Sequence, residues 1–378
     1  MKLNEIATIT MGQSPDSASY NIVREGIPFF QGNADFGKVH PNVRVWCSSP
    51  KKYAHKDDIL ISVRAPIGAL NVADQECCIG RGLAAIQVVS LKCLKDYIFY
   101  FLSSRVPELN AKGTGSTFKA ISKGILENIE IPLISLEEQR EIVKNLEDID
   151  QAIEMCNLLT EKTEDLVKSR FIELFGDPVT NPKGWKTSLV RDTSELISDG
   201  PFGSNLKTSH YVAEGIRVIR LGNIGSGKFL DEDKAYISEE HYATLKKYTC
   251  HAGEIVIGTL GEPNLRACLI PDDIAVSINK SDCVHFIPKT ELLNNIYACA
   301  YLNTEGALQL AQRSLHGQTR SRIAMSQVAA LPIMLPPLAL QNEFAAFVEQ
   351  ADKSKLVIQE LLKKHELLKE ALLQKYFG

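Results

Sequence analysis

The chain contains one segment twice, and this duplication constrains its fold more than any other feature. With the sequence shifted by 202 residues, IEIPLISLEEQREIVKNLEDID (129–150) aligns with LPIMLPPLALQNEFAAFVEQAD (331–352), and the register holds without a gap until Phe175-Gly176 meets Phe377-Gly378. Between residues 129 and 176, 13 of 48 positions are identical. Chance would give about three, at ~6% per position for ordinary residue usage. We therefore expect two halves that share one fold.

Each copy reads as a short strand, a proline-containing turn and a helix of roughly 40 residues, on the order of 60 Å long at 1.5 Å per residue. Apolar residues recur along both helices at alternating spacings of three and four, which is typical of a coiled-coil seam. Neither helix is apolar enough to stand alone, so each is the natural partner of the other. The predicted seam comprises Ile142, Ile149, Leu159 and Leu166 in the first helix, and Phe344, Phe347, Ile358, Leu361, Leu368 and Leu372 in the second.

The segments before the two helices also correspond, more loosely. Residues 26–39 resemble 215–229, 57–72 resemble 253–269, 95–104 resemble 295–303, and 112–122 resemble 316–326. They are β-rich, with glycine-rich turns and a helical stretch in each, so each block is predicted to be a compact α/β (α+β) domain. The predicted organisation is a first domain at 1–130, a helix region at 131–180, a second domain at 181–335 and a second helix region at 336–378.

Composition narrows the class of protein. The length of 378 residues and 44% apolar content are those of a soluble globular protein with two or three domains. No apolar run reaches the length of a membrane span, so we expect a cytoplasmic protein. The nine cysteines are scattered, which predicts reduced cysteines and no zinc site. Net charge is −4, and residues 131–180 alone hold 5 basic and 12 acidic residues. That segment would repel phosphate, so we expect it to face protein or solvent.

Motifs for catalysis are missing from the sequence. The stretch GNIGSGKF (222–229) is one letter short of a phosphate-binding loop, because Phe229 stands where a Ser or Thr is required. It aligns with a segment of the first block that lacks such a loop, and no long helix follows Lys228, so we predict a turn. No hydrolase elbow, zinc-protease helix, dinucleotide fingerprint or adenine-methyltransferase motif occurs. We predict a chain without catalytic residues, metal or bound cofactor.

Polar turns at matched places in both blocks remain as candidate binding residues. Arg and Lys neutralise phosphates or read guanine, while Asn and Gln pair with adenine. Glycine beside hydroxyls and cations, as in GTGSTFK (113–119) and GQTRSR (317–322), suits close approach to phosphates. A protein that binds other proteins through solvated loops is also compatible with this pattern. The predicted DNA-binding residues are Gln31, Asn33, Arg64, Arg81, Thr114, Ser116, Thr117, Lys119, Arg220, Asn223, Arg266, Asn279, Lys280, Gln318, Thr319, Arg320 and Arg322.

The order block, helix, block, helix resembles the specificity subunits of type I restriction–modification systems. The resemblance rests on IPLISLEEQREI (131–142), echoed by LPPLALQ (335–341), on Phe-Gly at each helix end, and on NPKGW (181–185) opening the second block. Together these motifs cover essentially the whole chain. The first block lacks the Gly184-Trp185 lead, so we expect its N-terminal edge to be held less firmly.

The resemblance implies a non-catalytic subunit that binds double-stranded DNA. Each block would be a target recognition domain for one half of a split sequence, and the helices would form an antiparallel coiled coil that sets the spacer. Two methyltransferase subunits carrying S-adenosylmethionine would bind it, and restriction subunits using ATP and Mg can add to the complex. A related system with nuclease and methyltransferase in one partner chain fits equally well. A protein-only coiled-coil scaffold is the alternative from another class, and a small-molecule enzyme ranks third.

Overall fold

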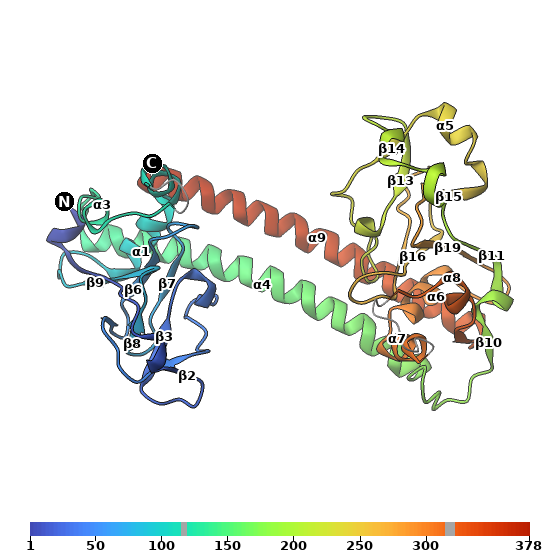
Figure 1. The fold of residues 1–378 in the computed structure, drawn as a ribbon, viewed down its shortest axis with the longest axis horizontal. Coiled ribbons are helices and arrows are strands. Elements are labelled where there is room, and N and C mark those ends of the chain that lie inside the picture. Colours follow the sequence, from blue (N-terminus) through green and yellow to red (C-terminus); the bar gives the residue numbers. More distant parts are fainter. Residues whose placement is uncertain (115–118, 314–321) are drawn as a thin grey trace. The chain divides into compact units, whose positions relative to one another are not determined.

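A computed structural model describes residues 1–114, 119–313 and 322–378. The chain divides into two compact units: unit 1 comprises Met1–Leu158 and Gln359–Gly378, and unit 2 comprises Leu159–Ile358. Two 40-residue helices, α4 (Leu136–Phe175) and α9 (Leu338–Phe377), contribute to both units (Figure 1). Unit 1 therefore contains the start of α4 and the end of α9, and unit 2 contains the reverse.

Unit 1 is built on two sheets whose strand orders are β1-β9-β6-β7 and β2-β4-β3-β8-β5. All its strand pairs are antiparallel except β3 with β8. The elements are β1 (Ala7–Met11), β2 (Tyr20–Asn21), β3 (Ile27–Phe30), β4 (Trp46–Cys47), β5 (Tyr53–Ala54), β6 (Ile59–Ser62), β7 (Leu70–Val72), β8 (Cys77–Ile79), β9 (Leu83–Val88), α1 (Lys95–Ser104), α2 (Val106–Lys112) and α3 (Lys123–Glu127).

Unit 2 repeats both strand orders, as β11-β19-β16-β17 and β12-β14-β13-β18-β15, and adds the pair β10-β20. Its one parallel pair in the described residues, β13 with β18, again joins the centre of the five-stranded sheet. The elements are β10 (Thr187–Leu189), β11 (Ser194–Ser198), β12 (Tyr211–Val212), β13 (Ile216–Ile219), β14 (Tyr236–Ile237), β15 (Thr249–His251), β16 (Ile255–Gly258), β17 (Arg266–Leu269), β18 (Val276–Asn279), β19 (Cys283–Pro288), β20 (Pro332–Met334), α5 (Glu239–Ala243), α6 (Asn295–Leu302), α7 (Glu305–Gln312) and α8 (Met325–Ala329).

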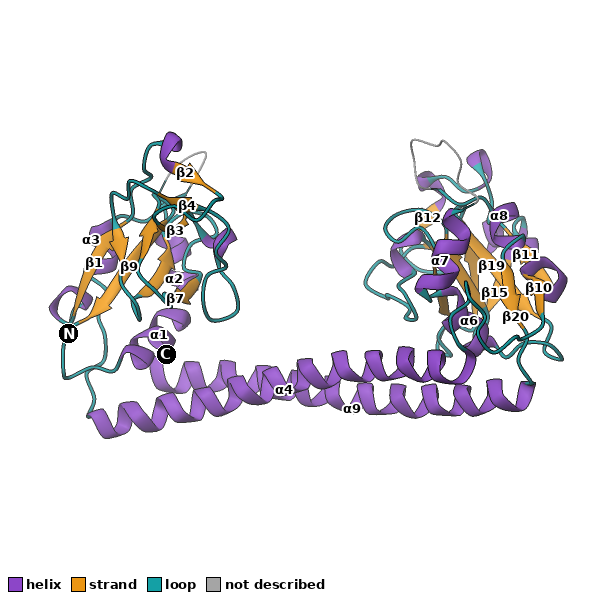
Figure 2. Ribbon diagram, turned by 90° about the horizontal axis from the view of Figure 1, so that it is seen from below, coloured by secondary structure: helices purple, strands orange, loops and turns teal. Residues whose placement is uncertain are grey.

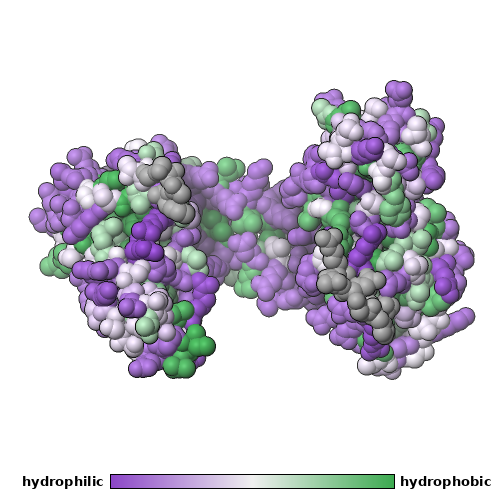
Figure 3. Space-filling view, viewed as in Figure 1, coloured by the Kyte–Doolittle hydropathy of each residue, from purple (hydrophilic) through white to green (hydrophobic). Residues whose placement is uncertain are grey.

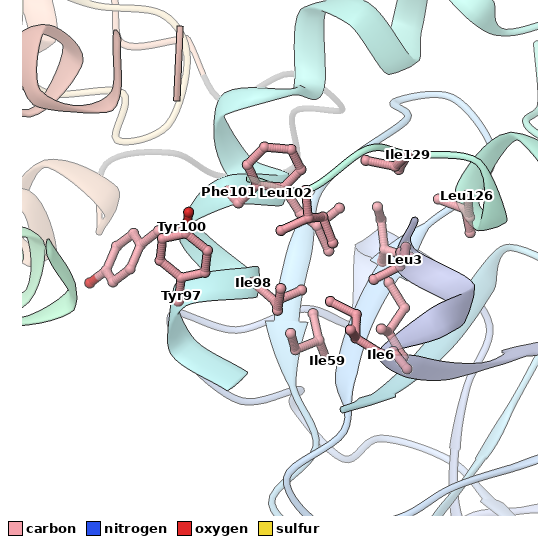
Figure 4. Close-up of a cluster of buried hydrophobic side chains, with 14 of the residues drawn as sticks. Leu3, Ile6, Ile59, Tyr97, Ile98, Tyr100, Phe101, Leu102, Leu126 and Ile129 are labelled. Atoms are coloured by element: carbon pink, nitrogen blue, oxygen red, sulfur yellow. The ribbon is translucent and has the colours of Figure 1, made fainter. Parts of the chain in front are cut away.

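The core of unit 1 lies between its four-stranded sheet and α1. The short apolar run ILIS forms β6, which is buried along its whole length. Figure 4 shows Ile98 of α1 beside Ile59 of β6 and Ile6, with Phe101 and Leu102 further along the helix. In unit 2, β16 and α6 play the same part. The predicted α/β character of both blocks is confirmed.

The N-terminal edge of unit 1 pairs with the segment before α4 through backbone hydrogen bonds and an isolated bridge between Lys2 and Glu130. The amino group of Met1 donates to Ile131 O (3.0 Å), and Leu3 N donates to Ile129 O (2.9 Å). Leu3 is itself fully buried. The corresponding edge of unit 2 has the same kind of pairing, since Val190 N donates to Leu331 O (2.9 Å), and there the Trp185 indole adds a bond to Phe175 O (3.0 Å).

A buried glutamine fastens the start of each long helix to its block. Gln139 accepts from Leu94 N (2.8 Å) and donates to Lys92 O (2.9 Å) and Ile134 O (3.0 Å). Gln341, 202 residues later, makes the same three bonds to Asn294 N (2.9 Å), Leu292 O (3.0 Å) and Pro336 O (2.8 Å). The duplication has thus preserved the joint between block and helix.

Replacing Gln341 with alanine is expected to lower the free energy of unfolding by about 3 kcal/mol, because two carbonyls and one amide would lose their buried partner. Urea unfolding of the full chain measures the loss, and hydrogen exchange of peptides from unit 2 locates it. Gln350→Ala, at an exposed position of α9, is the control and should change stability by less than about 0.5 kcal/mol. Equal effects of the two changes would contradict the assigned role.

The ends of the helices insert phenylalanines into the blocks. Phe377 lies with its ring centroid 5.4 Å from that of Tyr97 and 5.6 Å from that of Phe101, both on α1. In unit 2, Phe175 is 4.7 Å from Tyr297 on α6. Each block therefore holds the start of one long helix and the end of the other.

Of the ten predicted seam residues, six are buried or half-buried and four are exposed. Ile142, Ile149 and Phe344 are buried, and Phe347, Ile358 and Leu372 are half-buried. The exposed fractions are 45% for Leu159, 55% for Leu166, 43% for Leu361 and 47% for Leu368. The next residue in each case, Thr160, Val167, Leu362 or Lys369, is half-buried instead.

A specific contact explains one of these one-residue shifts. Lys369 Nζ lies 2.5 Å from Asp150 Oδ1 and 6.0 Å from the ring centroid of Tyr100, whose hydroxyl donates to Asp150 (2.9 Å). Turning Lys369 inward satisfies this carboxylate, and the neighbouring Leu368 is left outside. Spacings of three then four, or four then three, give the same heptad, so apolar periodicity alone does not distinguish them.

The stretch GNIGSGKF is a turn, as predicted. Gly225 N donates to Lys228 O (3.0 Å), Ile224 pairs with Phe229 across the turn, and Gly227 adopts a φ of 76°. The next regular element is the strand β14, so no helix N-terminus is available to hold a phosphate here.

His285 on β19 makes the stability of unit 2 depend on pH. It is buried, and its Nε2 lies 2.7 Å from Glu254 Oε2. Burial lowers the pKa of His285 below its usual 6.5, and Glu254 opposes that shift only in part. The imidazole of His285 therefore binds a proton more readily in the unfolded chain than in the folded one.

The contribution of neutral His285 to the free energy of unfolding should be complete above about pH 6.5 and should fall as the pH is lowered through that value. Unfolding measured from pH 7.5 to 5 should show a slope that His285→Gln reduces; an identical slope would exclude His285 as its source.

Candidate nucleic-acid interface

Four segments of unit 1 meet where the central strand β3 ends. Gly80 N, in the turn between β8 and β9, donates to Phe30 O (2.8 Å). Val63 N, after β6, donates to Gly82 O (2.9 Å), and Ile121 N donates to Val63 O (2.9 Å). Three backbone hydrogen bonds thus gather side chains from distant parts of the sequence.

Unit 2 builds the same junction from the corresponding residues. Lys280 N donates to Ile219 O (2.9 Å) at the end of β13. Thr259 N, after β16, donates to Asp282 O (3.1 Å), and Ile323 N donates to Thr259 O (3.0 Å). Within each unit, α1 or α6 lies close to the long helices, whereas β2 or β12 lies toward the opposite end (Figure 2). The two junctions are equivalent positions on equivalent blocks.

In unit 1 the junction opens into a shallow hollow of about 780 Å³. Gln31, the first residue after β3, reaches Ser14 Oγ, which lies 3.1 Å from its Oε1 and 3.0 Å from its Nε2. Ser14 Oγ also accepts from Arg81 N (3.3 Å). The lining residues are Ser14, Pro15, Ser17, Tyr20, Phe29, Gln31, Asp35, Val45 and Arg81.

Three more predicted residues of unit 1 lie beside each other. Thr114 and Ala120 exchange backbone hydrogen bonds of 3.0 and 2.9 Å, Arg64 is bridged to Ala120, and Ala65 N donates to Lys119 O (3.2 Å). Arg64, Thr114 and Lys119 are all exposed. This edge of the junction presents two cations and a hydroxyl to solvent, which suits contact with phosphates.

In unit 2 the residue that follows β13 is Arg220. Its Nη2 pairs with Asp233 Oδ1, and its Cζ lies 5.6 Å from the ring centroid of Tyr211. Lys280 Nζ lies 5.7 Å from the same centroid. Two cations therefore flank one aromatic ring, and a carboxylate holds one of them.

Arg322 marks the outer edge of the second junction. Its Nη2 lies 2.7 Å from Asp282 Oδ1, and the two side chains are 44% and 23% exposed. Burial raises the pKa of the nearby Asp199 carboxyl, Arg322 lowers it, and Asp282 raises it further. Arg322 thus lies among carboxylates at this edge, whereas the described residues of unit 1 record no ion pair for Arg64 or Lys119.

Three predicted binding residues have structural positions instead. Asn223 is fully buried and bonds to Arg220 N (2.9 Å), Leu230 O (2.8 Å) and Asp233 O (2.8 Å). Asn279 is also fully buried and donates to Cys283 O (2.6 Å). Arg266 donates to four backbone carbonyls, those of Ile224, Leu260, Pro263 and Leu221, at 2.6 to 3.1 Å. These side chains shape the junction and are not free to bind a ligand.

Of the remaining predicted residues, one lies at the turn after β3 and five fall outside the described residues. Asn33 is half-buried and begins the short turn after Gln31. Ser116 and Thr117, like Gln318, Thr319 and Arg320, lie outside the described residues. Sequence analysis missed Tyr20, Tyr211, Ser14 and Asp233. The two tyrosines begin the equivalent strands β2 and β12, but they precede the aligned segments 26–39 and 215–229, and no motif marked them.

The described residues offer no group of three or more His, Cys, Asp or Glu side chains placed to hold a metal ion. All nine cysteines are buried, and none forms a disulfide within the described residues. Burial raises the pKa of Cys93 to about 11 and of Cys77 to about 12. No helix within 1–114, 119–313 and 322–378 is both long and apolar enough to cross a membrane.

Comparison with known proteins identifies the family. The profile of the type I restriction modification DNA specificity domain matches residues 1–164 and 182–368, one match for each half of the duplication. A Methanocaldococcus jannaschii protein named for the specificity subunit of type I restriction enzyme MjaX is 48% identical over 160 residues, which are 42% of this chain and 38% of that protein. The chain thus spans well under half of the MjaX subunit.

Two further relatives cover the whole chain. The EcoBI specificity subunit of Escherichia coli is 19% identical over 406 residues, covering 100% of this chain and 85% of its own. The crystal structure of the type I restriction–modification S subunit from M. genitalium matches all of this chain and 95% of its own with a TM-score of 0.56 and 16% identity, a likeness of fold. With both halves matched by the same profile, the chain belongs to the type I restriction modification DNA specificity domain family.

Proposed function

We propose that the chain is the DNA sequence-recognition subunit of a type I restriction–modification complex. Each unit would read one half of a bipartite target through its junction. The observation that carries this proposal is that two equivalent junctions have the same backbone hydrogen bonds but different side chains, Gln31 in one and Arg220 in the other. A shared scaffold with different polar groups suits the reading of two different half-sites.

The long helices would hold the two recognition units and set the spacer. In unit 1 the contacts of α4 with α9 run in opposite directions along the two helices: Asn145 with Tyr376, Asp150 with Lys369, and Cys156 with His365. In unit 2, Arg170 pairs with Glu343 and Phe171 packs on Phe344. These contacts support an antiparallel coiled coil.

Two adenine methyltransferase subunits would bind this coiled coil. Apolar side chains are exposed along α4 and α9 and appear green among the hydrophilic purple in Figure 3. Three pairs of these exposed residues are related by the 202-residue offset of the repeat: Met155 with Val357, Leu159 with Leu361, and Leu166 with Leu368. Duplicated apolar stripes support two equivalent partner surfaces.

The chemistry would belong to the partners. S-adenosylmethionine would be held by the methyltransferase, which flips an adenine to methylate it, and ATP and Mg by a restriction subunit. The part of this chain would be to bind DNA and to position the enzymes on it.

Adenine methylation mapping by single-molecule sequencing tests the proposal. Cells that carry this gene and an active partner methyltransferase should show a split motif, with two short half-sites around a fixed gap, and that motif should vanish when this gene alone is deleted. Methylation unchanged by the deletion would refute the proposal. It would favour a protein-only scaffold, which the exposed apolar stripes and the net charge of −4 also suit.

A further inference from the structure

We propose that the first residue after the central strand selects one base in each half-site: Arg220 reads a guanine for unit 2, and Gln31 reads an adenine for unit 1. This inference rests on the proposed function and adds to it the chemistry of one base pair in each half-site. Both residues occupy one topological position, because Phe30 O and Ile219 O, just before them, accept the equivalent bonds from Gly80 N and Lys280 N.

A side chain of the turn that follows accepts from the backbone N–H of each residue, although the turn begins at Gly32 in unit 1 and at Arg220 in unit 2. Asp35 Oδ2 accepts from Gln31 N (2.7 Å), and Asn223 Oδ1 accepts from Arg220 N (2.9 Å). The two junctions differ by a single inserted residue, since Asp35 lies four residues after Gln31 and Asn223 three after Arg220. A fixed backbone with a changed side chain is what a position that determines specificity requires.

Arg220 is oriented by groups that are themselves anchored. Asp233, which pairs with its Nη2, has its carbonyl bonded to Asn223 Nδ2 (2.8 Å) and Arg217 Nη2 (3.2 Å). Tyr211 supports the guanidinium from one face. Arginine carries five N–H donors, so one bond to Asp233 leaves enough donors for the two parallel bonds that guanine O6 and N7 accept.

Charge favours a base edge over a phosphate as the ligand of Arg220. The Asp233 side chain is 47% exposed, so its carboxylate lies beside the guanidinium at the surface. That carboxylate neutralises part of the guanidinium charge and fixes its orientation, so Arg220 offers directed N–H donors suited to the neutral acceptors of guanine. Lys280, beside the same Tyr211 ring, supplies a second cation for a neighbouring phosphate. We therefore assign Asp233 as a positioning residue.

Gln31 has the complementary chemistry. Its amide supplies a donor and an acceptor in one plane, which match N7 and the N6 amino group of adenine. Ser14 Oγ, within 3.1 Å of both amide atoms, holds the amide at the rim of the hollow, and an adenine edge would take over these two bonds. Arg81 in the same hollow supplies positive charge for the neighbouring backbone.

Methylation mapping of the complex with Arg220→Gln and, separately, Gln31→Arg tests the assignment. Arg220→Gln should relax or change one guanine position, with discrimination reduced about 10- to 100-fold, in one half-site only. Gln31→Arg should do so at an adenine position of the other half-site. The spacer and all other positions should stay as in the wild type.

A second variant keeps the assignment testable if Arg220→Gln does not fold or loses all methylation. Asp233→Asn keeps Arg220 and removes only the charge that orients it, so it should weaken discrimination about tenfold at the position that Arg220 reads, measured relative to the other positions of the same half-site. The assignment would be overturned if Asp233→Asn left discrimination unchanged and Arg220→Gln gave an unchanged or absent motif. It would also be overturned if the variants of Arg220 and Gln31 altered the same half-site. A wild-type chain without a split motif would instead refute the proposed function, before any variant is compared.

Discussion

Replacing Phe344 with alanine is expected to lower the free energy of unfolding by about 4 kcal/mol, the largest single effect on stability that we anticipate. Phe344 is fully buried in unit 2, with its ring centroid 5.6 Å from Phe171 and 5.5 Å from Phe175. Its loss would remove these edge-on contacts and leave a cavity where α4, α9 and the block meet. Because both long helices pack through this ring, the helix ends and the block should loosen together.

Urea unfolding of the full chain gives the size of the effect, and hydrogen exchange shows its location. Peptides from unit 2 should exchange faster, while those from 1–114 should keep wild-type rates. Phe202→Ala is the matched control, because that ring is 49% exposed and its removal should change stability by less than about 1 kcal/mol. A loss for Phe344→Ala no greater than for the control would mean that this aromatic cluster does not hold the helices to the block.

The duplication predicted most of the fold because its conserved positions are joints. Gln139 and Gln341 are among the 13 identities, and both tie a helix start to a block. The two Phe-Gly pairs at the helix ends place Phe175 and Phe377 in the aromatic cores. Identity at a fixed offset therefore marked structural contacts, although nothing in the pattern said what each residue touched.

The phase of the seam could not be predicted in the same way. Adjacent apolar residues such as Leu361 and Leu362 satisfy the heptad equally well. The inward position is decided by contacts with the other helix, among them the pair of Lys369 with Asp150, and such long-range pairs have no signature in local periodicity.

Some predicted site residues lie together on turns, whereas others have side chains that fold inward. Gln31, Arg81, Arg64 and Lys119 gather at one junction because four loops meet there through backbone bonds. Asn223 looks identical in sequence to an exposed asparagine, yet it satisfies the buried backbone of its own turn. Asp233 was missed because a carboxylate does not look like a DNA-binding group until the arginine beside it is seen.

Replacing Leu166 and Leu368 with aspartate is expected to abolish binding of both proposed methyltransferase partners while leaving the chain folded. The two leucines are equivalent in the repeat and are 55% and 47% exposed, so their replacement costs the fold little. Burying one leucine against a partner contributes about 1.5–3 kcal/mol, and burying an unpaired carboxylate there would cost several more. Each change should therefore weaken one partner contact by about 100-fold or more.

Native mass spectrometry of the purified complex measures the result as a change in stoichiometry. Leu166→Asp and Leu368→Asp should each leave one methyltransferase bound, and the double variant none. Lys168→Ala with Glu370→Ala is the matched control: both residues are exposed, and each lies two positions from a leucine, so it faces another side of the helix. If the double variant retained both partners with its helical content intact, the partner surface would have to lie elsewhere, and the matched exposure of these leucines would need another cause. If instead the single changes released both partners at once, the two surfaces would be coupled rather than independent, contrary to the equivalence that the duplication implies.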